Sequence, residues 1–189
     1  LGIEDEEYIQ STPAQIPGLD DIVAIDTRED HNLALNKYGQ VFVWGANYYG
    51  QLGNGTTEDL WAPALLDSLA NITAIAAGDF HSLAVDQDGR VWAWGDNSYG
   101  QAGKDPSIQL EVHIPELVAG INNAKVIAVA AGYKHSLALT SEGTVYAWGF
   151  NRWGQVGGYG ETENNPNPTP KTVPYNGSDL TGVSLIEAG

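Results

Sequence analysis

The chain has 189 residues and a formal net charge of −16 at pH 7, with 24 acidic residues against eight Lys and Arg. Affinity for a phosphate backbone comes mainly from basic side chains, so this balance argues against nucleic acid as a partner and favours a basic one. Cysteine is absent, which excludes disulfides, thiol catalysis and Cys-type zinc sites together. The 42% hydrophobic content and six Trp predict a packed globular protein.

The N-terminal residues 1–19 are expected to be the end of a repeating unit, because Leu1-Gly2 aligns with Leu52-Gly53 of the next one. No apolar run approaches the roughly 18 residues that cross a bilayer, and no signal-peptide pattern opens the chain. The sequence contains no Met, so we expect a processed product or an excised piece of a longer chain.

The first complete repeat is predicted over residues 20–68. A strand from Ile22 to Asp26 is followed by His31-Asn32-Leu33-Ala34-Leu35, and the turn Asn36-Lys37-Tyr38-Gly39 leads into a strand that ends at Trp44-Gly45. Short strands separated by turn residues are typical of antiparallel sheets. Apolar residues occupy both faces of these strands, which predicts sheets covered on both sides, as in blades that stack on one another.

The same order of residues returns in a second repeat over residues 69–121 and in a third over 122–175. The separations from His31 to His81 and from His81 to His135 are 50 and 54 residues. This period is in the range of propeller blades and solenoid units. Residues 176–189 are expected to form the first strand of a following repeat.

The stretches between the repeated hairpins are variable and contain proline. A fourth outer strand or a connecting loop fits there, around residues that include Pro13, Pro17, Pro63, Pro106 and Pro115. Residues 158–170 are the most polar and proline-rich segment, which predicts a long surface loop.

These motifs resemble the repeat of the regulator of chromosome condensation family. Its signature pairs a Gly-x-x-His-Ser-Leu-Ala-Leu hairpin with Trp-Gly-x-Asn-x-x-Gly-Gln, and this chain carries three complete copies and two partial ones. The resemblance implies an all-β fold, a β-propeller that is seven-bladed in well-known members, of which this chain would supply about three and a half blades.

Residues that recur in every repeat are predicted to be structural. Three histidines could suggest a zinc site, but equivalent positions in successive blades are set by what every blade needs, so we expect no metal and no cofactor. Histidine can link neighbouring backbone segments, Trp supplies apolar area, and Gly permits backbone geometry that a side chain would obstruct. The predicted structural positions are His31, His81, His135, Trp44, Trp94, Trp148, Gly45, Gly95 and Gly149.

Partner-binding residues are predicted where the repeats differ within a fixed framework. Two turns qualify, the one before each His and the one after each Trp-Gly. Tyr, Trp and Arg are enriched at interface hot spots, although the recurrence of aromatics at Tyr49, Tyr99 and Trp153 is also consistent with packing. The predicted partner-binding residues are Tyr48, Phe80, Tyr133, Lys134, Arg152 and Trp153.

The favoured function is a non-enzymatic scaffold that presents blade loops to another protein. One alternative is a structural or self-assembling component whose open blade edges, near Val23 and Val183, contact further repeats or further copies of the chain. The resemblance adds a regulator of the nucleotide-exchange type. An enzyme with a site in the central channel is the remaining alternative, although no nucleophile, base and orienting group form a visible set. Acidity, absent Cys and few Lys favour an extracellular or cell-surface bacterial location.

Overall fold

A computed structural model describes residues 12–121, 124–157 and 166–189. The described residues form three four-stranded antiparallel sheets, which we call blades 1 to 3. Blade 1 consists of β1 (Ile22–Arg28), β2 (His31–Asn36), β3 (Val41–Gly45) and β4 (Leu60–Leu65). Blade 2 consists of β5 (Ile72–Ala77), β6 (His81–Asp86), β7 (Val91–Asp96) and β8 (Glu111–Leu117). Blade 3 consists of β9 (Val126–Ala131), β10 (His135–Thr140), β11 (Val145–Gly149) and β12 (Asn167–Thr172).

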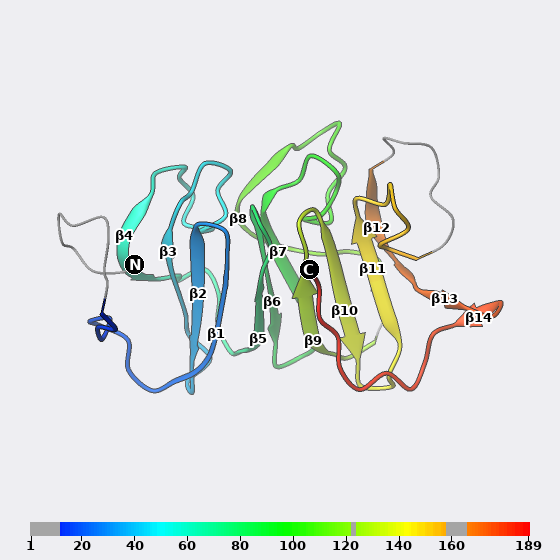
Figure 1. The fold of residues 1–189 in the computed structure, drawn as a ribbon, viewed down its shortest axis with the longest axis horizontal. Helices are drawn as coiled ribbons and strands as arrows, with labels where there is room; N and C mark the ends of the chain where they lie inside the picture. Colours follow the sequence, from blue (N-terminus) through cyan, green and yellow to red (C-terminus); the bar gives the residue numbers. More distant parts are fainter. Residues whose placement is uncertain (1–11, 122–123, 158–165) are drawn as a thin grey trace.

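The three blades stand side by side, with blade 2 between the other two (Figure 1). Within each blade the strands follow one another in chain order across the sheet. Strand β5 packs against β1 and β2 on one side and against β9 on the other. The buried apolar residues of all three blades form one continuous cluster. This arrangement confirms the predicted all-β propeller class.

Every blade has the same central hairpin, in the same register. His31 pairs with Gly45, His81 with Gly95 and His135 with Gly149. All six residues of β6 are buried, because blade 2 is covered on both faces. The repeat spacing of the sequence therefore corresponds to the spacing of one blade.

The proline-containing stretches provide the fourth, outer strand of each blade. Pro63 lies in β4, Pro115 in β8, and Pro168 with Pro170 in β12. Proline is tolerated there because an outer strand is paired on one side only. The predicted surface loop over 158–170 is therefore wrong for its last part, and residues 158–165 lie outside the described residues.

The C-terminal segment contains β13 (Pro174–Tyr175) and β14 (Ser178–Asp179), which pair with each other. The strand expected within 176–189 is not formed beyond this short hairpin. The start of a blade is nevertheless visible, because the Val183 amide donates to the Gly143 carbonyl at 3.1 Å, as Val126 does to Gly89 in the preceding blade at 3.2 Å.

Candidate protein-interaction surface

A hydrogen-bonded group joins blade 1 to blade 2. The His31 Nε2 atom lies 2.9 Å from Ser82 Oγ, and this hydroxyl donates to the Gln51 carbonyl at 2.9 Å. The Trp94 indole donates to the same carbonyl at 2.7 Å. A serine hydroxyl has a single proton, and the Gln51 carbonyl receives it. The ring of His31 is therefore the donor to Ser82, through Nε2.

The junction of blades 2 and 3 repeats this group. His81 Nε2 lies 2.9 Å from Ser136 Oγ, Ser136 donates to the Gln101 carbonyl at 2.8 Å, and Trp148 donates to that carbonyl at 2.8 Å. In both junctions the His and Gln belong to the earlier blade and the Ser and Trp to the later one. The junctions therefore have a direction.

Burial keeps the junction histidines neutral. It lowers the pKa of His31 to about 4 and that of His81 to about 3, and it also lowers the pKa of His135. The rings of His31 and His81 are hydrogen-bonded within the junctions. The described part of the chain contains no group of three or more His, Asp or Glu that could hold a metal ion.

The glycine after each hairpin Trp lies where a side chain cannot fit. Gly95 has φ of 98°, and a Cβ placed there would lie 2.5 Å from the Phe80 carbonyl oxygen and 2.7 Å from His81 Cα. Gly45 and Gly149 have φ of 106° and 99° and similar close contacts. These contacts give a physical reason for the recurrence of glycine.

A buried asparagine shapes the long loop that follows. The Asn97 side chain donates to the Lys104 and Gln109 carbonyls at 3.0 and 2.6 Å and accepts from the Ala102 amide at 3.1 Å. Asn47 makes the equivalent contacts in blade 1. The framework of these loops is thus fixed, and the side chains on it differ between blades.

Aromatic side chains from the two variable turns meet across the blade junctions. Tyr49 of the blade 1 loop contacts Phe80 of blade 2, with ring centroids 5.2 Å apart, and Phe80 contacts Tyr133 of blade 3 at 6.4 Å. The ring of Tyr99 contacts Phe150 at 4.7 Å. These rings lie at the blade edge where the first strand of each blade ends, and we call this set the aromatic ridge: Tyr49, Phe80, Tyr133, Lys134, Tyr99 and Phe150.

Lys134 connects the two parts of the ridge. Its ammonium group lies 4.7 Å from the ring centroid of Tyr99 and 5.3 Å from that of Tyr133, and 4.0 Å from an Asp96 carboxylate oxygen. Only 20% of its side chain is exposed. Lys134 was predicted to contact a partner, and the structure places it mainly within its own chain.

The other predicted partner-binding residues lie at different distances from the ridge. Tyr133 is 50% exposed and Phe80 is half-buried, so both can present a surface. Tyr48 and Trp153 are 65% and 78% exposed and make no ring contact with the ridge. The guanidinium of Arg152 lies 5.0 Å from the ring centroid of Trp153.

Arg28 is a residue that sequence reasoning missed. It occupies the position of Gly78 in the next repeat, and its side chain forms an ion pair with Asp79 and donates to the Ala188 carbonyl at 3.2 Å. The signal was present in the sequence, because blade 1 alone replaces the repeated glycine before the His turn. Arg28 thereby ties blade 1 to blade 2 and to the C-terminal segment.

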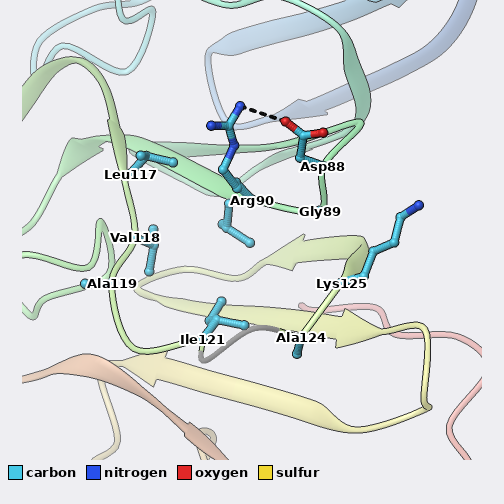
Figure 2. A pocket seen from close by; sticks show the side chains of 10 residues that line it. Asp88, Gly89, Arg90, Leu117, Val118, Ala119, Ile121, Ala124 and Lys125 are labelled. Atoms are coloured by element: carbon cyan, nitrogen blue, oxygen red, sulfur yellow. Dashed lines mark ion pairs between the residues drawn. The ribbon is translucent and has the colours of Figure 1, made fainter.

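A cleft lies at the opposite edge of the blades, between the β6–β7 turn and the segment that leads into β9 (Figure 2). Its volume is about 590 Å³, and aliphatic side chains that include Leu117, Val118 and Ile121 line it. Arg90 at its rim is paired with Asp88 at 3.2 Å. The residues that line this cleft include no Ser, Thr, Cys or His.

Three stacked four-stranded blades with a repeated junction define a partial β-propeller built from sequence repeats. The profile of the regulator of chromosome condensation (RCC1) repeat matches residues 38–85, 88–139 and 142–189, and a second RCC1 profile matches 22–51, 72–101 and 126–155. The chain belongs to the RCC1 repeat family. No helix in the described ranges is long and apolar enough to span a membrane.

Among curated proteins, the chain is similar to large ubiquitin ligases and to a plant photoreceptor. It is 38% identical over 147 residues to E3 ubiquitin-protein ligase HERC2 of Homo sapiens, covering 78% of the chain and 3% of that protein. It is 38% identical to probable E3 ubiquitin-protein ligase HERC4 of Homo sapiens (96% and 17% covered), and 34% identical to ultraviolet-B receptor UVR8 of Arabidopsis thaliana (68% and 29%). The chain thus spans a minor part of each relative.

Solved structures support the same assignment. Yeast RCC1 (Prp20) bound to Kap60 superposes with a TM-score of 0.78 at 28% identity, covering 96% of this chain and 43% of that one. Human WBSCR16 superposes with a TM-score of 0.76 at 27% identity, covering 91% and 43%.

Proposed function

We propose that the chain is a non-catalytic protein-interaction module that binds a basic partner protein on the aromatic ridge. The observation that carries this proposal is the ridge itself, in which rings from all three blades meet at one edge, with Tyr49 and Tyr99 on loops held by buried asparagines. Rigid aromatic side chains bury a large area at little entropic cost, as interface hot spots do.

The charge around the ridge favours a basic partner. Glu29 and Asp30, in the blade 1 turn that corresponds to the Phe80 turn, are both exposed. The cations nearby are already engaged, since Lys134 lies between two rings and Arg28 is paired with Asp79. A basic surface would therefore meet unpaired carboxylates beside exposed rings.

Comparison with known proteins is consistent with protein binding. One of the similar structures is yeast RCC1 in complex with Kap60, and another concerns the binding of Prp20p to Gsp1p and histones. The relatives among ubiquitin ligases contain this kind of repeat within much longer chains.

The test begins with affinity capture on the immobilised chain and identification of the retained protein by mass spectrometry. Calorimetry then compares the wild type with Tyr133→Ala, for which we expect about a tenfold loss of affinity because a half-exposed ring at the ridge centre is removed. Tyr175→Ala is the matched control, since Tyr175 is 62% exposed and lies on the β13–β14 hairpin. Equal affinities of wild type and Tyr133→Ala would refute the ridge as the site.

Nucleotide exchange on a small GTPase is a second candidate, supported by the likeness to yeast RCC1 over 96% of the chain. Release of a fluorescent guanine nucleotide from a purified GTPase, measured with and without the chain, decides this candidate. An accelerated release that persists in Tyr133→Ala would favour exchange through another surface.

A further inference from the structure

The linkers between successive blades differ in length. The amides of Leu66 and Ile72 anchor the linker of the first junction to the hairpin of blade 1, and those of Val118 and Val126 anchor the linker of the second junction to the hairpin of blade 2. The two anchors are six positions apart in the first linker and eight in the second. Residues 122–123 of the second linker lie outside the described residues.

The second linker leaves aliphatic side chains partly uncovered. At the first junction Leu66 and Leu69 are 3% and 7% exposed and belong to the buried core. Their counterparts Val118 and Ile121 are only half-buried, and together with the exposed Leu117 they line the cleft of about 590 Å³ (Figure 2). Clefts of about 300–1,000 Å³ with mostly apolar walls are typical binding sites. The second junction therefore presents an aliphatic surface where the first junction buries a leucine of the chain itself.

The rim of this cleft carries a cation that is available to a ligand. Lys125 takes the position of the uncharged Asn71 at the first junction. It is exposed, and the ion pairs within the described residues do not include it. Arg90 is already engaged, since its guanidinium pairs with Asp86 at 2.8 Å and with Asp88 at 3.2 Å. An acidic group beside an aliphatic one complements this combination of a lysine and apolar walls.

We propose that the cleft between blades 2 and 3 binds a segment of a partner protein in which a leucine is next to an acidic residue. The leucine side chain packs on Leu117, Val118 and Ile121, and the acidic side chain accepts from the Lys125 ammonium. A leucine is the appropriate side chain because Leu69 occupies the equivalent place in the first linker. The cleft lies at the blade edge opposite the aromatic ridge, so this site is additional to the ridge and does not depend on it.

The test titrates the isotope-labelled 189-residue chain with the peptide acetyl-Gly-Ser-Leu-Glu-Ser-Gly-amide, followed by amide chemical shifts. Salt at about 0.15 M screens the repulsion between the acidic chain and the acidic peptide. The amides of Val118 and Ile121 should shift, and those of Leu66 and Leu69 at the first junction should not. Replacing the peptide's Leu by Ser should weaken binding by about tenfold or more. Replacing its Glu by Gln should weaken binding by about threefold, as expected for an exposed ion pair.

Two variants of the chain have matched controls. Leu117→Ala should weaken binding by about fivefold because part of the apolar wall is removed, whereas Leu65→Ala should not, since Leu65 has the equivalent position in β4 and a similar exposure (41% against 43%). Lys125→Glu should abolish the preference for the Glu peptide over the Gln peptide. Lys171→Glu makes the same charge change at an exposed residue of β12 and should preserve that preference.

Circular dichroism should show that all four variants are folded. Absence of shifts at Val118 and Ile121, or equal affinities for the Leu and Ser peptides, overturns the proposal. Equal losses in Leu117→Ala and Leu65→Ala overturn it as well. Octanoate, which combines an aliphatic chain with a carboxylate, is titrated in parallel. Shifts at these amides with octanoate but not with the peptide would reject a peptide ligand in favour of a fatty acid.

Discussion

At the scale of single residues, the serine of each junction has two tasks. Ser136 accepts from the neutral ring of His81 and donates to the Gln101 carbonyl, and both partners are fully or almost fully buried. A buried polar group that loses its partner retains the cost of leaving water. The hydroxyl therefore holds two blades in one register, and the side chain contributes little apolar area of its own.

Ser136→Ala should lower the free energy of unfolding by about 2–4 kcal/mol, because two buried groups lose a partner at once. Urea denaturation followed by tryptophan fluorescence measures this loss. Ser141→Ala is the control, since Ser141 is exposed and its hydroxyl contacts only the neighbouring Glu142. A loss no larger than in the control would mean that the junction hydroxyl is dispensable.

Stability should depend on pH through the same histidines. On folding, the pKa falls from an ordinary 6.5 to about 4 for His31 and to about 3 for His81. At a pH between the unfolded and the folded pKa of each ring, the unfolded chain therefore binds more protons than the folded one. The stabilisation of the fold by the neutral rings is fully present above pH 6.5, and it is lost as the pH falls below 6.5 and through the folded pKa values of about 4 and about 3. The two groups together give a slope of about 2.7 kcal/mol per pH unit near pH 5.

Urea midpoints measured from pH 7 to pH 4.5 check this slope. His81→Gln removes one titrating ring and should reduce the slope by about half, although it lowers stability at pH 7. An unchanged slope in this variant would assign the acid sensitivity to the carboxylates.

At the scale of structural elements, the hairpin glycines combine two constraints that can be separated. Gly95 has both a positive φ and no room for a Cβ, since Phe80 and His81 lie within 2.7 Å of it. Gly177 has φ of 83° but nothing within 4 Å of a Cβ. Gly95 is therefore needed both for its backbone conformation and because a Cβ has no room, whereas Gly177 is needed for its backbone conformation alone.

Gly95→Ala should therefore cost about 3 kcal/mol or more, whereas Gly177→Ala should cost about 1 kcal/mol, the usual strain of a left-handed non-glycine residue. Thermal unfolding of the two variants gives the comparison. Similar losses at both positions would show that backbone conformation, and not close packing, explains the repeated glycine.

The sequence predicted the strands and hairpins better than it predicted the contacts between blades. Recurrence at a fixed spacing located the hairpins and the residues His81, Trp94 and Gly95, because local turn chemistry and strand alternation depend on near neighbours. The contact of Tyr49 with Phe80 depends on how one blade is placed against the next, which no local spacing encodes. The strand at Pro168 was missed for a related reason, since proline argues against a strand unless its edge position is known.

At the scale of the whole molecule, blade 2 differs from its neighbours because both of its faces are covered. Strand β6 is buried throughout, whereas β2 and β10 each include half-buried residues. In repeat arrays each unit is stabilised by its own contacts and by those with its nearest neighbours. The central blade has two such interfaces and the outer blades have one each.

Amide hydrogen exchange should show that the central blade opens less often than the two outer blades. The amides of Ala34, Ala84 and Ala138 occupy equivalent positions in the middle hairpin strand, and all three side chains are fully buried. We expect the amide of Ala84 to exchange about tenfold more slowly than the other two, because opening it requires breaking both junctions. Faster exchange at Ala84 than at Ala34 would contradict a nearest-neighbour description.

The direction of the junctions also limits how such a molecule can be rearranged. A segment cut from one histidine to the next carries an acceptor for the blade before it and a donor for the blade after it, so it can be spliced between two blades in one orientation and can be copied in tandem. Arg28 interrupts this interchangeability, since it stands where the other repeats have glycine and holds the Asp79 carboxylate and the Ala188 carbonyl together. The position of blade 1 in the array is therefore fixed by its contacts with blade 2 and with the C-terminal segment, a restriction that the repeats with glycine at this position lack.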